Sequence, residues 1–139
     1  MIHQIDKVLY TAKTHTTGGR DGAGKSSDGA LDVKLSSPGS KQPGTNPEQM
    51  FAVGWSACFM GAMGLAAKKR RIVLPADAAV DAEVDLGLTG DAFSLRARLS
   101  VHVPGLSRDV VEDLVHEAHR TCPYSKATRG NIDVLIDVV

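Results

Sequence analysis

Residues 50–67 read MFAVGWSACFMGAMGLAA, eighteen residues without a charged side chain. Asn, Pro and Glu at positions 46–48 precede this stretch and favour a helix start, because Asn caps the first turn, Pro suits the first helical position and a carboxylate stabilises the positive end of the helix dipole. Four cations at positions 68–71 follow, where a helix C-terminus favours positive charge. The sequence therefore predicts a central helix over residues 46–71.

The central helix has no polar face, so it must be buried on all sides. Its length alone would also admit a membrane span, but its many alanines and glycines are only weakly lipophilic and strand hairpins are expected on both sides. A chain of 139 residues with a few short strands can hardly surround such a helix. We therefore expect a twofold dimer in which two central helices pack through Ala57, Gly61 and Gly64. The alternative is a monomer whose core the helix fills.

The segments around the central helix show strand alternation or a helical period. They predict an N-terminal hairpin over 4–36 with a long, flexible, glycine-rich tip, a β-hairpin over 78–103, a helix over 107–121 that Ser107 caps and Pro123 ends, and a last strand over 131–138. The order ββ-α-ββ-α-β predicts a single α+β domain over residues 1–139, with mostly antiparallel strands.

Composition narrows the possible partners. Sixteen Lys and Arg balance sixteen Asp and Glu, so no overall field would attract nucleic acid or an anionic membrane. The N-terminal residues lack the basic start and apolar core of a secretory signal, so we expect a cytoplasmic protein with reduced thiols. The two cysteines, Cys58 and Cys122, stand in no CxxC or Cys/His cluster, and no metal is expected.

One segment matches the sequence pattern of a phosphate-binding loop but lacks the structural context that the motif requires. Residues 19–26 read GRDGAGKS and satisfy the pattern GxxxxGK[ST]. That motif binds phosphate because a helix begins directly after the loop and directs its amides at the ligand. Here a Ser-Asp-Gly turn and an alternating strand follow, so nucleotide binding is not expected.

Cys58 lies in the middle of the apolar helix, and the simplest interpretation is a buried core cysteine. A thiol in apolar surroundings has a raised pKa and is inert unless a cation lies nearby. Arg20 on the glycine-rich tip is a candidate cation, and Glu48 could hold its guanidinium in a bidentate pair. Ten residues separate Glu48 from Cys58, roughly 15 Å of rise in one helix. The two meet only if the helix breaks, for instance at Gly54, or across the dimer, which we favour.

Two segments carry a resemblance to a known family. Residues 46–59, NPEQMFAVGWSACF, resemble the peroxidatic segment of the organic hydroperoxide resistance (Ohr) family in the OsmC superfamily, and residues 118–132, AHRTCPYSKATRGNI, resemble its resolving segment. The resemblance extends over essentially the whole chain, and two long motifs in the right order make it specific. Met50 and Trp55 depart mildly from the pattern, which could reshape the substrate pocket.

The resemblance implies an OsmC-like intertwined homodimer, with antiparallel sheets wrapped around two long buried central helices and the active sites at the interface. It implies a thiol-dependent peroxidase for organic hydroperoxides, with Cys58 as peroxidatic thiolate, Cys122 as resolving thiol, Arg20 activating the thiolate and Glu48 orienting Arg20. No bound cofactor is implied. The electron donor would be a dihydrolipoyl group on a lipoylated partner protein.

The apolar side chains near Cys58 suggest a preference for fatty or aromatic hydroperoxides. The candidates for the substrate pocket are Phe51, Trp55, Phe59 and Met63. Two alternatives stay open: a broader-substrate, osmotically inducible (OsmC-type) peroxidase, and a non-enzymatic dimer that senses redox state or binds a hydrophobic ligand.

Overall fold

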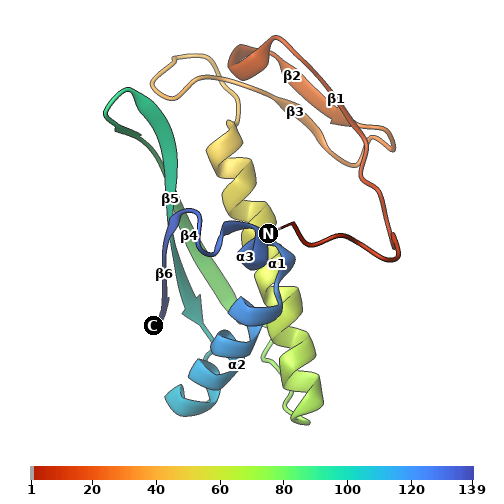
Figure 1. The fold of residues 1–139 in the computed structure, drawn as a ribbon, viewed down its shortest axis with the longest axis vertical. Coiled ribbons are helices and arrows are strands. Elements are labelled where there is room, and N and C mark those ends of the chain that lie inside the picture. The colour runs from red at the N-terminus through yellow and green to blue at the C-terminus, as the bar shows by residue number, and fades with distance from the viewer. Residues whose placement is uncertain (1) are drawn as a thin grey trace. The chain divides into compact units, whose positions relative to one another are not determined.

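A computed structural model describes residues 2–139 (Figure 1). The chain forms two compact units, the first ending at Pro47 and the second spanning Glu48–Val139. The second unit holds both cysteines and the main hydrophobic core. Helices and strands together confirm the α+β class.

The first unit is a small antiparallel sheet of order β1-β2-β3, formed by β1 (Thr14–Thr17), β2 (Ala23–Ser26) and β3 (Asp32–Lys34). The strand expected from residue 4 is confined to β1. The prediction of a long flexible tip was wrong, because the glycine-rich stretch contains the short 3-10 helix η1 (Gly19–Asp21) and then β2.

Two glycines explain why the chain reverses so sharply between β1 and β2. Gly18 has φ +72°, and a Cβ on Gly22 would lie 1.8 Å from the carbonyl oxygen of Thr17. Only glycine fits there, and the tight reversal returns residues 23–26 alongside β1. The GRDGAGKS stretch thus becomes a turn and a strand with no helix after it, which is not the arrangement of a phosphate-binding loop.

The helix α1 (Pro47–Lys69) runs without a break through the uncharged stretch. Arg71 adopts a left-handed conformation with φ 56°, and the N–H groups of Arg71 and Ile72 bond back to Lys68 and Ala67, which ends the helix as a Schellman cap. By length and composition α1 could cross a membrane. In the fold it is the core helix of the second unit.

The second sheet has the order β4-β5-β6. The strands β4 (Ala79–Thr89) and β5 (Ala92–His102) form the expected antiparallel hairpin around a two-residue turn. The strand β6 (Asp133–Val138) pairs in parallel with β5, so the strands are mostly antiparallel, as predicted, with one parallel pair in the second sheet. The parallel pairing arises because helices lie between β5 and β6 in the chain and form a crossover.

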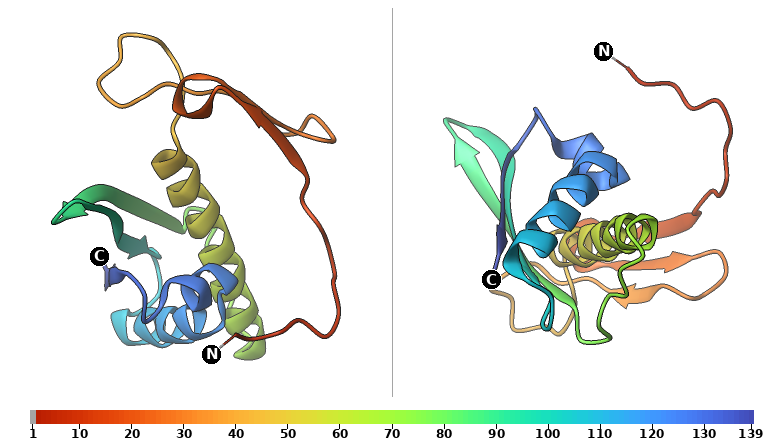
Figure 2. Two further views of the ribbon diagram at one scale, coloured as in Figure 1. Left: turned by 45° about the horizontal axis from the view of Figure 1, so that its top comes forward. Right: turned by 90° about the horizontal axis from the view of Figure 1, so that it is seen from below.

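Two helices make that crossover. The helix α2 (Arg108–Thr121) begins as predicted, since Ser107 Oγ accepts the N–H of Val110 at 3.4 Å. Pro123 does end α2, but it also begins a short helix, α3 (Pro123–Thr128), that the sequence analysis did not predict. Figure 2 shows α1 and α2 on one side of the sheet, and the buried side chains of β5, α1 and α2 fill the space between them.

Candidate active site

The structure brings the two cysteines together. Cys58 on α1 and Cys122 between α2 and α3 are both free thiols, and their Sγ atoms lie 3.4 Å apart. Cys122 is fully buried, whereas Cys58 keeps part of its surface exposed. An exposed sulfur in contact with a buried one is an arrangement in which the first can react with a solute and the second can then bond to it.

Local backbone chemistry fixes the position of Cys122. The residue before a proline avoids the helical conformation, and Cys122 is extended with φ −60° and ψ 125°. Its N–H donates to the carbonyl of Ala118 at 2.8 Å, and its own carbonyl accepts the N–H of Lys126 at 2.9 Å. Cys122 is therefore tied to α2 on one side and to α3 on the other.

The short helix α3 packs closely against α1. Trp55 Nε1 donates a hydrogen bond to Ser125 Oγ at 3.1 Å, and both residues are fully buried. A Cβ on Gly54 would lie 3.2 Å from the hydroxyl of Tyr124, so the lack of a side chain at this position lets the tyrosine lie across the helix. The Tyr124 ring also contacts Phe51, with ring centroids 6.1 Å apart.

The electrostatics of Cys58 oppose ionisation in this arrangement. Burial raises the pKa of the Cys58 thiol, the neighbouring Cys122 raises it further, and the backbone N–H of Tyr124 offsets part of this effect. Since only a thiolate attacks a peroxide, an active Cys58 requires additional positive charge.

The other predicted site residues lie as follows. Glu48 is in the first turn of α1, and Arg20 is in η1 of the first unit. Because α1 is continuous, a helix break at Gly54 does not bring Glu48 to Cys58. The assignment of Arg20 and Glu48 to the same site as Cys58 stays a prediction.

The four pocket candidates differ in exposure. Trp55, Phe59 and Met63 are fully buried in the core of the second unit, whereas Phe51 is only partly buried. Phe51 thus offers the most surface of the four to a ligand. The assignment of the four residues to a substrate pocket stays a prediction.

Two cavities of the second unit lie away from the cysteines. One of about 830 Å³ lies where the end of the β4–β5 hairpin meets the start of β6, and one of about 400 Å³ lies between α2 and β6. Neither is lined by Cys58 or Cys122. The described residues hold no group of three or more His, Cys, Asp or Glu that could bind a metal ion.

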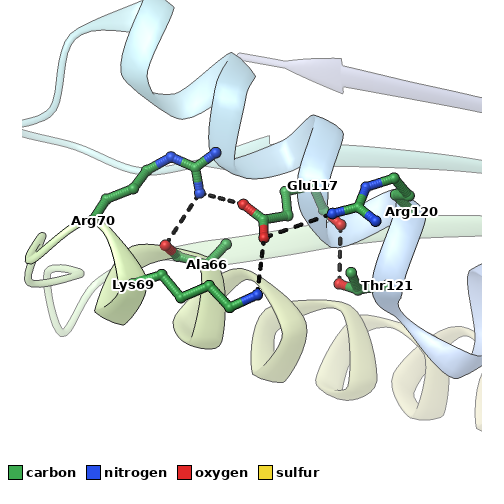
Figure 3. A network of polar contacts seen from close by, with 6 residues as sticks. All are labelled: Ala66, Lys69, Arg70, Glu117, Arg120 and Thr121. Carbon is green, nitrogen blue, oxygen red and sulfur yellow. Dashed lines mark hydrogen bonds and ion pairs between the residues drawn. The ribbon is translucent and has the colours of Figure 1, made fainter.

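Ionic contacts join the C-terminal end of α1 to α2 (Figure 3). Glu117 accepts hydrogen bonds from Lys69 at 3.4 Å and from Arg70, and Arg120 lies 3.8 Å away. Arg70 in particular holds the pKa of Glu117 below its ordinary value. The network lies on α2 about one turn before Cys122, so it helps to hold the helix that carries this cysteine.

Sequence reasoning did not single out Ser125 or His119. Ser125 was detectable in principle, because a buried Trp N–H requires an acceptor and this chain has one Trp. The Nδ1 atom of His119 is buried and has no hydrogen-bond partner within residues 2–139. Burial, and then the charges of Arg129 and His116, lower the pKa of His119.

Comparisons with known proteins agree with one another. Residues 37–137 match the family described as OsmC-like protein. The organic hydroperoxide resistance protein of Xanthomonas axonopodis pv. citri is 47% identical over 135 residues, covering 94% of this chain and 95% of that protein. The crystal structure of OhrB of Bacillus subtilis superposes with a TM-score of 0.89 at 41% identity, covering 95% of this chain and 100% of that one. An organic hydroperoxide resistance protein of Legionella pneumophila gives 0.88, also at 41% identity, with 95% and 98% covered.

Proposed function

Since the chain belongs to the OsmC-like family, with organic hydroperoxide resistance proteins among its close relatives, we propose that it is a cysteine peroxidase that reduces organic hydroperoxides to alcohols. The observation that carries the proposal is the 3.4 Å contact between the sulfurs of Cys58 and Cys122. A structural cysteine needs no second thiol in contact with it, whereas a peroxidatic cysteine needs a thiol to capture its oxidised form.

The proposed reaction cycle has three steps. The Cys58 thiolate attacks the distal peroxide oxygen, the O–O bond breaks, and the sulfur becomes a sulfenic acid while the alkoxide takes up a proton and leaves as the alcohol. The thiol of Cys122 then attacks the Cys58 sulfur, forming the disulfide and releasing water. A dithiol reduces this disulfide by two exchange steps and leaves as its own disulfide.

Arg20 is the group that we assign to the activation of Cys58. The raised pKa of the buried thiol requires a cation beside it, and a guanidinium also stabilises the alkoxide that leaves. Glu48 would orient Arg20 through a bidentate pair and compensate its charge. Because an unbroken helix separates Glu48 from Cys58, we place this pair across the interface of a homodimer.

The homodimer itself is supported by the surface of α1. Val53, Ala57, Gly61 and Leu65 recur every four residues and are all exposed, with Val53 70% and Leu65 66% accessible. Nothing lies within 4 Å of a Cβ built on Gly61, so a second helix has room to approach closely there. A stripe of apolar and small residues on a core helix favours burial against another copy.

The family likeness supports a proposal for the reductant, and the absence of a secretory signal pattern near the N-terminus supports one for the cellular location. A dihydrolipoyl group on a lipoylated protein would supply the two electrons for each cycle, and the cytoplasm would keep both cysteines reduced between cycles. No cofactor need stay bound to the chain.

Intact-mass analysis tests the proposal directly. One equivalent of cumene hydroperoxide should convert the reduced protein to a species lighter by two hydrogens, and Cys58→Ser should prevent this change. A Cys58→Ser variant that turns over hydroperoxide as fast as the wild type would refute the assignment. Comparing rates for cumene hydroperoxide and hydrogen peroxide separates this function from a broader-substrate peroxidase.

A further inference from the structure

We propose that the buried hydrogen bond between Trp55 and Ser125 is a positioning device that holds Cys122 in reach of Cys58 and so controls how efficiently the two sulfurs join. The inference rests on the proposed disulfide chemistry and deepens it. This role of Trp55 is separate from its candidacy for the substrate pocket. Trp55 and Ser125 both act through the cysteines.

The placement of the two residues relative to the sulfurs supports this role. Trp55 precedes Cys58 by three residues on α1, and Ser125 follows Cys122 by three residues in α3. Residues three apart in a helix are neighbours on its surface, which applies to Trp55 and Cys58, and Cys122 directly precedes the first turn of α3. The 3.1 Å bond from Trp55 Nε1 to Ser125 Oγ therefore joins the two elements beside the point where the sulfurs meet.

A shift of α3 would reach Cys122 through a backbone hydrogen bond. The carbonyl of Cys122 accepts the N–H of Lys126, the residue next to Ser125, at 2.9 Å. Cys122 is therefore hydrogen-bonded to the first turn of α3. If Ser125 moves away from Trp55, Cys122 moves with it. The ionic network of Glu117 also joins α1 to α2, but it contacts α1 at Lys69 and Arg70, eleven or more residues from Cys58.

The hydrogen bond between Trp55 and Ser125 is fully shielded from water. Trp55 and Ser125 are each 0% exposed, so water cannot replace either partner and the donor is satisfied only when α3 lies in this position. A buried polar pair of this kind specifies one arrangement of two elements more sharply than apolar packing does. The apolar contact of Phe51 with Tyr124 lies on the same side but imposes no such directional requirement.

The consequence concerns the fate of oxidised Cys58. The sulfurs must move about 1.4 Å closer than their 3.4 Å contact to reach disulfide bonding distance. Until they do, the sulfenic acid is open to a second hydroperoxide, which transfers an oxygen to the sulfur, gives a sulfinic acid and releases a second alcohol. Displacements near 1 Å can cost up to about a hundredfold in rate. Holding Cys122 in place therefore favours the disulfide over irreversible oxidation.

The test uses the full-length protein and two readouts. Ser125→Ala removes the acceptor with the smallest change of volume, and Trp55→Phe removes the donor. The matched control is Thr128→Val, because Thr128 is also buried in α3 but donates only to carbonyls of α3, those of Tyr124 and Ser125. Circular dichroism verifies that each variant is folded. If the variant of one residue of the Trp55–Ser125 pair does not fold, the variant of the other residue decides the test.

The first readout is the ratio of sulfinic acid to disulfide by intact mass after excess cumene hydroperoxide. The second is the equilibrium between disulfide and dithiol in mixtures of reduced and oxidised dithiothreitol, with no peroxide present. We expect Ser125→Ala and Trp55→Phe each to raise the sulfinic ratio about tenfold and to shift the equilibrium about tenfold toward the dithiol. In the double variant, the change in each readout should be no larger than in the more affected single variant. Both substitutions remove the same hydrogen bond, so their effects should not add.

The inference is overturned if Ser125→Ala behaves like Thr128→Val in both readouts, or if the effects of the two single variants add. Failure of the proposed function looks different. Wild-type protein that forms the disulfide with oxidised dithiothreitol but not with hydroperoxide would end the peroxidase assignment, and a shifted equilibrium in Ser125→Ala would still support the positioning role.

Discussion

The sulfurs of Cys58 and Cys122 lie in contact at 3.4 Å, although 64 residues separate the two cysteines along the chain. One sulfur is partly exposed and the other is buried. Under the proposed function, this asymmetry favours Cys58 as the residue that a hydroperoxide reaches first and Cys122 as its resolving partner. The variants of the two cysteines are therefore expected to fail in different ways.

Cys58→Ser should abolish hydroperoxide reduction, since a serine hydroxyl is not oxidised by a hydroperoxide. Cys122→Ser should instead be oxidised once to the sulfenic acid and then be overoxidised to the sulfinic acid by a second hydroperoxide, because Cys58 has no thiol to condense with. Mass spectrometry of each variant after stoichiometric and excess cumene hydroperoxide distinguishes these outcomes. Repeated turnover by Cys122→Ser without an added thiol that could replace it would contradict the resolving role.

Arg20→Ala should slow the reaction of Cys58 at neutral pH. Burial already raises the pKa of this thiol, so loss of a guanidinium beside it would raise the pKa further and lower the thiolate fraction. We expect alkylation by iodoacetamide to slow about tenfold, the effect of about one pKa unit. The rate should recover at high pH, where the thiolate forms without help.

Lys25→Ala is the matched control for that experiment. Lys25 is also a cation of the first unit, but it lies on β2 in a weak pair with Asp32 at 3.9 Å. Its loss should leave the alkylation profile of Cys58 unchanged. If Arg20→Ala and Lys25→Ala give the same profile as the wild type, Arg20 does not belong to the site.

Gly61→Leu should dissociate the dimer without unfolding the chain. A Cβ at Gly61 meets nothing within 4 Å in the protomer, but a leucine there would obstruct the close approach of a second α1. Leucine also forms helices better than glycine, so helix content should not fall. Light scattering should report a dimer for the wild type and a monomer for the variant. A dimer of unchanged affinity in Gly61→Leu would place the interface elsewhere.

The elements that the sequence predicted well are those with a local cause. The helix α1 follows from an uncharged stretch between a capping triplet and a cationic end, and the β4–β5 hairpin follows from strict alternation around Gly90. The start of α2 was correct because a serine cap is a short-range hydrogen bond. Each of these signals is complete within a few residues of the element that it marks.

The elements that were missed depend on the rest of the fold. The strand β2 lies in a stretch of turn-forming residues and forms only because Gly18 and Gly22 reverse the chain onto β1. The helix α3 has six residues, too few for a periodic pattern, and it is held by contacts with α1. Of the candidate site, the sequence predicted both cysteines, but their 3.4 Å contact is a tertiary distance that no spacing along the chain contains.

Acidification should destabilise the protein through His119. Its pKa is lowered from the ordinary value of 6.5, first by burial and then by Arg129 and His116, so the folded state resists protonation of this ring. The unfolded chain takes up the proton at the ordinary pKa. The contribution of His119 to stability is therefore fully present above pH 6.5 and is lost as the pH falls toward the lowered pKa.

His119→Gln should remove this dependence, because the amide does not titrate in this range. We expect the fall in Tm between about pH 7.5 and about pH 5.5 to be smaller in His119→Gln than in the wild type. His15→Gln is the control, because His15 is an exposed histidine of β1 and is not among the groups that lower the pKa of His119. If the two variants lose Tm equally on acidification, the buried ring of His119 is not the group that responds. A smaller fall in His119→Gln alone would identify the buried ring of His119 as a source of acid sensitivity in α2, the helix that directly precedes Cys122.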